Sequence, residues 1–285
     1  MADQSAGIVF IHGAWHNHET WDHVLPYLQA RGIVTTVFDM PGAGAKAKLP
    51  ASFLKRPLDS QAFATEPSPN AGVTQDERTD FVIGQVRETA EKCGGKVVIA
   101  GHSLGGATVS HVVERVPELI SAAVYITAFM LPPGMPPVAM IQDELMADAL
   151  VPGLFAADPQ AVGALRVDFR SEDPDYQSRV HEAYAGDVGE EMFKKAEAHL
   201  HCDEPAQVAT VPSPVTKERF GTVPRHYIHC TEDRAVTPAG QKKMIALVDD
   251  AMGTKTAVHV MRTSHSPFDA DPQGLARILG DIALG

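Results

Sequence analysis

The chain has 285 residues, which suits one large α/β domain or one domain with an inserted lid. Its formal net charge of −12 argues against nucleic-acid partners and anionic membrane surfaces, because both select basic patches. No apolar run is long enough to span a bilayer, the first residues do not resemble a signal peptide, and the three cysteines are widely spaced. We therefore expect a cytoplasmic protein with free thiols and no membrane partner.

Short apolar runs alternate with helical patterns along the chain. A helix is predicted from Thr74, whose capping-box partner is Glu77, to the glycine pair Gly94–Gly95. Thr237 and Asp271 each precede a proline and are predicted to begin two later helices. The repeated units predict a mostly parallel central sheet with helices on both faces. The predicted strands are residues 8–11, 34–38, 97–100, 123–126, 226–229 and 257–261.

Two stretches interrupt this alternation. Residues 45–73 are rich in Ala, Pro and Ser, and such a long excursion is usually functional or mobile. Residues 130–223 are rich in Pro, Met and acidic residues, with short helical patterns such as Glu190–His201 and no clear strand. We interpret residues 130–223 as an inserted, mainly helical cap (lid) domain. The core domain is then formed by residues 1–129 and 224–285.

Residues 97–107 combine a predicted strand, a turn and the start of a helix, with Ser103 at the apex. The turn Gly101-His-Ser-Leu-Gly105 fits G-x-S-x-G, the nucleophile elbow. A serine in such a strained turn needs neighbours without side chains, so that its hydroxyl stands clear of the backbone. The helix that follows directs free N–H groups to the point where negative charge would develop. We interpret Ser103 as a nucleophile.

A serine hydroxyl needs a histidine to take its proton, and that histidine needs an acid to orient it. With this elbow the acid follows the serine in the chain, and the histidine comes last. His265 lies in a loop directly after the final predicted strand and is the candidate base. Asp233 and Glu232 follow the preceding strand, and the pattern leaves both open as the acid, although only one can reach the histidine.

An acyl-transfer site also needs donors for the oxyanion. The backbone N–H of Leu104, directly after the nucleophile, is one candidate, and that of Ala14, in the loop after the first strand, is the other. The histidines at 12–23 and the group around His199 and His201 lack zinc-like spacing, so we predict no metal. The sequence contains no cofactor motif, and we predict none.

Four motifs together resemble the α/β-hydrolase superfamily, and more closely its hydroxynitrile lyase/plant methylesterase-like branch with the bacterial esterase relatives. They are Phe10-Ile-His-Gly-Ala-Trp-His16, Gly101-His-Ser-Leu-Gly-Gly106, Cys230-Thr-Glu-Asp-Arg-Ala235 and Ser264-His265. Lys217-Glu-Arg-Phe-Gly221 is also similar to that branch.

The resemblance implies the α/β-hydrolase fold and a catalytic triad of Ser103, Asp233 and His265. It also implies an oxyanion hole formed by the N–H groups of Ala14 and Leu104. The lyases of the branch carry a lysine directly after the catalytic histidine, where this chain has Ser266, so hydrolysis is favoured.

We therefore expect a serine esterase that acts through an acyl-enzyme on small or medium, largely apolar esters. The alternatives are a C–C lyase similar to the hydroxynitrile lyases and a non-catalytic small-molecule receptor. The expected partner is a small-molecule ester, and a homodimer is compatible with the sequence. Met and Phe side chains of the cap either line the pocket or form the core of the cap. The residues predicted to line the pocket are Trp15, His102, Phe129, Met130, Met140, Phe155 and Phe268.

Overall fold

A computed structural model describes residues 5–285. Residues 1–4, part of the N-terminal segment interpreted above, lie outside the described residues. Six strands form a parallel sheet in the order β2-β1-β3-β4-β7-β8. The prediction of a mostly parallel sheet is therefore confirmed. The strands are β1 (Gly7–Ile11), β2 (Val34–Thr36), β3 (Val97–His102), β4 (Ile120–Ile126), β7 (Arg225–Cys230) and β8 (Ala257–Met261).

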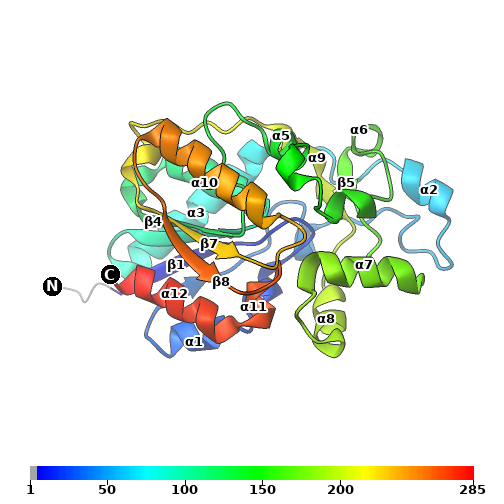
Figure 1. The fold of residues 1–285 in the computed structure, drawn as a ribbon, viewed down its shortest axis with the longest axis horizontal. Helices are drawn as coiled ribbons and strands as arrows, with labels where there is room; N and C mark the ends of the chain where they lie inside the picture. The colour runs from blue at the N-terminus through cyan, green and yellow to red at the C-terminus, as the bar shows by residue number, and fades with distance from the viewer. Residues whose placement is uncertain (1–4) are drawn as a thin grey trace.

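Helices cover both faces of the sheet (Figure 1). The helices α3, α4 and α10 pack on one face, and α1 and α12 pack on the other. Successive side chains of β1 point to opposite faces of the sheet. Val9 therefore packs in the core with the first group of helices, and Phe10 packs in the core with the second. The helices of the core are α1 (Leu25–Gln29), α3 (Gln75–Cys93), α4 (Gly105–Arg115), α10 (Pro238–Met252), α11 (Pro267–Ala270) and α12 (Pro272–Leu284).

Local capping explains where several helices begin and end. Thr74 and Glu77 form the predicted capping box of α3, and Gly94 ends that helix in the left-handed region at φ 66°. Thr237 and Asp271 accept hydrogen bonds from the first turns of α10 and α12. The strand ends differ by a few residues from prediction, since β2 ends at Thr36 and β4 begins at Ile120. The shorter 3-10 helices are His18–Trp21, Gly44–Lys46, Pro117–Leu119, Glu144–Met146, Val151–Leu154 and Phe220–Thr222.

Val215, Phe220 and Val223, near the end of residues 130–223, belong to the core beside α3, α4 and α10. Most of residues 130–223 lie beyond the carboxyl ends of the sheet strands, on the side to which the arrows of β7 and β8 point (Figure 1). They are mainly helical, but they also contain a two-stranded antiparallel sheet, β5 (Ala164–Arg166) with β6 (Asp203–Pro205). The expectation of no strand was therefore wrong, because three-residue strands are too short to show alternation. The helices are α5 (Pro137–Ile141), α6 (Pro159–Val162), α7 (Pro174–Ala185), α8 (Glu190–Glu197) and α9 (Ala206–Thr210).

The excursion at residues 45–73 packs against this second sheet. It contains the helix α2 (Ser60–Thr65), which Asp59 caps. The guanidinium of Arg166 on β5 donates to the carbonyl oxygens of Phe63 and Glu66 and forms a fully buried ion pair with Asp203 on β6. The excursion is thereby joined to residues 130–223 by buried polar contacts. No helix in residues 5–285 is both long and apolar enough to cross a membrane.

Candidate active site

The predicted nucleophile Ser103 lies between β3 and α4 with its backbone at φ 52°. Such a left-handed conformation is strained for a residue other than glycine. Its carbonyl oxygen accepts hydrogen bonds from Phe129 N and Gly106 N, which hold the turn. A Cβ atom at Gly105 would lie 2.5 Å from the carbonyl oxygen of His12, so the close approach of helix α4 to β1 requires glycine there.

The imidazole of His265 and the carboxylate of Asp233 are in direct contact. His265 Nδ1 lies 2.7 Å from Asp233 Oδ2, and both side chains are buried. An ionised carboxylate can only accept hydrogen bonds, so Nδ1 is the donor and Nε2 of the neutral ring is left without a proton. His265 follows β8 and Asp233 follows β7, so the parallel strands bring the two side chains to one edge of the sheet.

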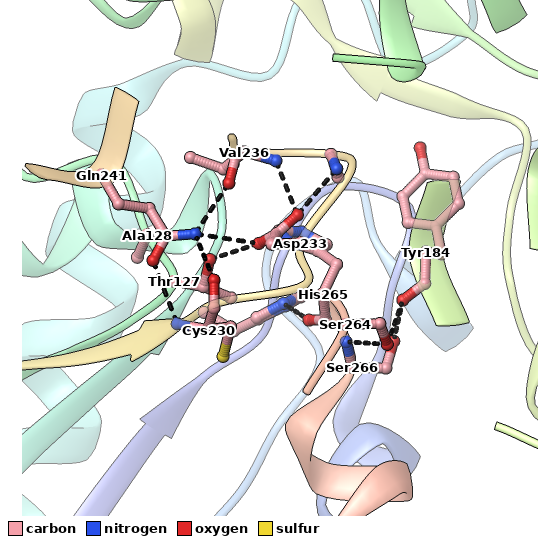
Figure 2. Close-up of polar contacts among 12 residues, drawn as sticks. Thr127, Ala128, Tyr184, Cys230, Asp233, Val236, Gln241, Ser264, His265 and Ser266 are labelled. Atoms are coloured by element: carbon pink, nitrogen blue, oxygen red, sulfur yellow. Dashed lines mark hydrogen bonds and ion pairs between the residues drawn. The ribbon is translucent and has the colours of Figure 1, made fainter. Parts of the chain in front are cut away.

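The carboxylate of Asp233 is surrounded by donors, which Figure 2 shows as dashed lines converging on it. Oδ1 accepts from the backbone N–H groups of Ala235 (2.7 Å) and Val236 (2.8 Å). Oδ2 accepts from the Thr127 hydroxyl and, at 3.5 Å, from the Gln241 amide. These donors hold the carboxylate in one orientation, so Asp233 is suited to orient the histidine. Sequence reasoning missed Thr127 and Gln241, whose role depends on contacts across the fold.

The other candidate acid, Glu232, points away from His265. Its Oε1 accepts from the exposed Arg262 at 2.7 Å, and this pair is largely in solvent. In the turn after β7 the two neighbouring side chains take different directions, so only one of the two carboxylates reaches the imidazole. In the structure that residue is Asp233.

The loop after β1 lies beside Ser103 and is held in a strained conformation. Trp15 has φ 63°; its indole N–H donates to Leu165 O at 2.8 Å, and its carbonyl oxygen accepts from His201 N at 3.0 Å. Within residues 5–285, the backbone N–H groups of Ala14 and Leu104 have no acceptor. Both residues line the pocket that contains Ser103 and His265. Two free donors beside a nucleophile are what an oxyanion site requires.

A buried ion pair supports this loop. Arg78 on α3 donates to both carboxylate oxygens of Glu204 on β6, and the two side chains are 1% and 0% exposed. Glu204 Oε2 also accepts from the backbone N–H of Trp15 at 3.4 Å. The carboxylate therefore joins α3, β6 and the loop after β1. Neither residue was identified from the sequence, because the two are 126 positions apart.

Several histidines close to the site are buried and neutral. Burial lowers the pKa of His16 to about 4 and that of His102 well below its usual value, and the neighbouring His265 lowers both further. His102 Nε2 contacts the carbonyl oxygen of His265 at 2.9 Å. Since a carbonyl oxygen only accepts, His102 donates and fixes the backbone of the loop that carries His265.

The pocket around Ser103 is small and apolar, and its free volume is about 50 Å³. Of the predicted lining residues, Trp15, Phe129 and Phe155 lie in its wall. Met146, one of the methionines whose role the sequence left open between pocket and core, also lies in the wall. Sequence reasoning missed further wall residues, because their approach to Ser103 depends on contacts between segments distant in the chain. They include Ile141, Leu165, Tyr184 and Val236.

Four residues predicted to line the pocket lie elsewhere. The ring of His102 is buried beneath the elbow, where Phe268 packs edge-on against it at 5.0 Å. Met130 belongs to the core on the face of the sheet that α3, α4 and α10 cover, and Met140 belongs to the apolar core that residues 130–223 form with the loop after β1. Phe268, Met130 and Met140 were expected at the pocket because of their residue type. In the fold, each is covered by neighbours that are distant in sequence.

A second, larger cleft of about 700 Å³ lies on the far side of Tyr184 and His16. It contains neither Ser103 nor His265, and it has Glu19, Glu190 and Asp269 in its walls. Within residues 5–285, no three His, Cys, Asp or Glu side chains gather closely enough to hold a metal ion. Ser103 and His265 line the smaller pocket and not this cleft.

Comparison with known proteins agrees with this architecture. The chain is 25% identical over 281 residues to a pyrethroid hydrolase of Sphingobium wenxiniae, spanning 97% of this chain and 87% of the relative. It is 25% identical over 284 residues to methylesterase 2 of Arabidopsis thaliana, spanning 96% and 95% of the two chains. The crystal structure of a pyrethroid hydrolase from Sphingobium faniae shares the fold, with a TM-score of 0.77 at 23% identity over 99% of this chain and 98% of the other.

The model of the alpha/beta hydrolase family matches residues 8–278. This range contains all six strands of the parallel sheet, the elbow at Ser103 and the loops that carry Asp233 and His265. The chain therefore belongs to the alpha/beta hydrolase family.

Proposed function

We propose that this protein is a serine hydrolase that cleaves carboxylic esters of small or medium, largely apolar substrates through an acyl-enzyme. One observation carries the proposal: the buried pair of His265 and Asp233 opens onto the same apolar pocket as Ser103 at the elbow. The relatives named as a pyrethroid hydrolase and a methylesterase support ester cleavage as the reaction type.

In the proposed reaction the Ser103 hydroxyl attacks the ester carbonyl while His265 Nε2 takes its proton. The negative charge that develops on the carbonyl oxygen is stabilised by the N–H groups of Ala14 and Leu104. His265 then gives the proton to the leaving alkoxide as the C–O bond breaks. A water molecule, deprotonated in turn by His265, attacks the acyl-enzyme, and the acid and free Ser103 are released. Asp233 stabilises the imidazolium formed in each half-reaction.

The position after His265 favours water as the second reactant. The Ser266 hydroxyl donates to the carbonyl oxygen of Tyr184 at 2.8 Å and is buried, so it brings no cation into the pocket. A lyase that releases an anion such as cyanide needs a positive charge there to stabilise the leaving group. Hydrolysis therefore remains the proposal, and release of cyanide from a cyanohydrin would be evidence against it.

The nucleophile is tested by labelling the protein with an organophosphate fluoride and measuring the intact mass. We expect one adduct on the wild type and none on Ser103→Ala, with ester turnover reduced by about 10⁴-fold or more. Ser121→Ala, a change at an exposed serine of β4, is the control and should label like the wild type.

A wild-type protein without an adduct, or an equal adduct on Ser103→Ala, would refute the proposal. Labelling without turnover of any ester in a panel of graded acyl and alcohol lengths would instead favour a binding protein that retains its ligand.

A further inference from the structure

Tyr184 is a buried tyrosine in the wall of the pocket. It lies in the last turn of α7 and is 3% exposed. Its ring packs edge-on against Trp15, with 6.0 Å between the centroids, and its centroid is 6.1 Å from that of His265. The side chain thus lies between the strained loop after β1 and the proposed base.

The Tyr184 hydroxyl has no hydrogen-bond partner within residues 5–285. The two other buried phenols, Tyr125 and Tyr227, and the partly buried Tyr176 differ in this respect. The Tyr125 hydroxyl contacts Ser110 Oγ at 2.9 Å, and those of Tyr227 and Tyr176 donate to the carbonyl oxygens of Ala128 and Leu154. Buried hydroxyls are almost always paired, so an unpaired phenol on a residue that lines the same pocket as Ser103 needs an explanation.

The hydroxyl keeps its proton under all ordinary conditions, because burial raises the pKa of Tyr184 well above its usual value. The group is therefore a neutral O–H donor. Its surroundings within the pocket wall are mainly apolar, including Phe155 and Leu165, so a hydrogen bond formed there would be poorly screened.

Contacts with the loop that carries His265 fix the position of Tyr184. Its carbonyl oxygen accepts from Ser266 Oγ at 2.8 Å and from Ser264 Oγ at 3.5 Å. Figure 2 shows this carbonyl group directed at Ser264 and Ser266, while the ring extends away from them. The two serines flank His265 in the chain, so these contacts fix the position of Tyr184 relative to the proposed base.

We propose that the Tyr184 hydroxyl is a specificity group that donates a hydrogen bond to a second oxygen atom of the substrate. This inference rests on the proposed function. The ester carbonyl oxygen already has the N–H groups of Ala14 and Leu104 as donors, so the phenol is left for another acceptor. The favoured substrates are then esters whose otherwise apolar acyl or alcohol group contains one ether or ketone oxygen at the distance of Tyr184.

The test compares matched esters that differ by one CH₂-to-oxygen exchange. One series consists of 4-nitrophenyl hexanoate and its analogues with an ether oxygen at successive acyl positions. A second series pairs butyl butanoate with 2-methoxyethyl butanoate, which places the oxygen on the alcohol side. For each pair, kcat/KM of the ether ester is divided by kcat/KM of the methylene ester, so that the ratio for a variant can be compared with that of the wild type.

For at least one oxygen position we expect Tyr184→Phe to lower this ratio by about three- to tenfold, the effect of one neutral hydrogen bond. The methylene esters should react at unchanged or slightly higher rates. Tyr176→Phe is the matched control, because the Tyr176 hydroxyl already has Leu154 O as its acceptor, and its ratios should equal those of the wild type. Tyr184→Phe removes only an unpaired oxygen, so its melting temperature should not fall.

A ratio that stays constant at every position would overturn the inference. An equal loss of kcat/KM for ether and methylene esters would also overturn it, because it would place the phenol at the reacting carbonyl. Failure of the wild type to hydrolyse any of these esters would instead count against the proposed function itself.

Discussion

At the scale of single residues, backbone strain gathers around one pocket. Within residues 5–285, the non-glycine residues with positive φ are Trp15 (63°), Ser103 (52°) and Thr127 (39°). They directly or closely follow β1, β3 and β4, at the carboxyl ends of neighbouring strands. Strained conformations persist only where surrounding contacts hold them, and they tend to cluster at functional sites. Thr127 also donates a hydrogen bond to Asp233, so one of the strained residues directly contacts a member of the proposed triad.

The identity of the acid can be tested by exchanging each of the adjacent carboxylates. Asp233→Asn should lower kcat for ester hydrolysis by about 10⁴-fold, because an amide at this position no longer selects the required tautomer of His265. Glu232→Gln breaks only an exposed pair with Arg262 and should leave kcat within about threefold of the wild type. Steady-state kinetics of the two variants decide the assignment. A larger loss in Glu232→Gln would reverse it.

At the scale of secondary-structure elements, the loop after β1 depends on a strand from the inserted segment. Glu204 on β6 accepts from Trp15 N and pairs with Arg78 on α3 in a fully buried contact. The attraction between two buried charges is offset by the loss of their hydration, so the pair itself is weak evidence for stability. Removing one partner is different, since the other charge then remains buried without compensation.

We therefore expect Glu204→Ala to lower the free energy of unfolding by about 3–5 kcal/mol. The same exchange at Glu190, whose pair with Lys194 is on the surface of α8, should leave the urea midpoint unchanged. Urea unfolding at pH 7 measures both. An equally small effect at the two positions would show that Arg78 finds another partner or water when Glu204 is lost.

At the scale of the whole molecule, the burial of histidines makes the free energy of unfolding depend on pH. The pKa of His16 is lowered to about 4, chiefly by burial, whereas an unfolded histidine titrates near 6.5. Between these values the unfolded chain binds the additional proton, so stability increases with pH in this window. The contribution is complete above pH 6.5 and is lost as the pH falls towards 4.

His16→Gln should remove this dependence while keeping a donor for the carbonyl oxygen of Ala14. The wild type should lose about 2 kcal/mol more than the variant between pH 8 and pH 5, as measured by urea unfolding at the two pH values. Identical losses in the two proteins would show that His16 is protonated in the folded state at pH 5.

The sequence by itself determined the features that depend on short stretches of chain. The turn around Ser103 could be predicted because glycines at 101 and 105 and the flanking strand and helix patterns are local. The caps at Thr74, Thr237 and Asp271 are local for the same reason, and the structure contains all three. The parallel sheet followed from the repeated strand and helix patterns. The position of His265 followed from chain order.

Only the tertiary structure decided how distant segments meet. It shows that Asp233 and not Glu232 contacts His265, and it pairs Arg78 with Glu204. It also places Tyr184 in the pocket wall, where Met130 and Met140 were expected. It also reveals the antiparallel pairing of β5 and β6. These features depend on side chains more than 30 positions apart, whose contacts are selected by packing of the whole fold and leave no periodic pattern in the chain.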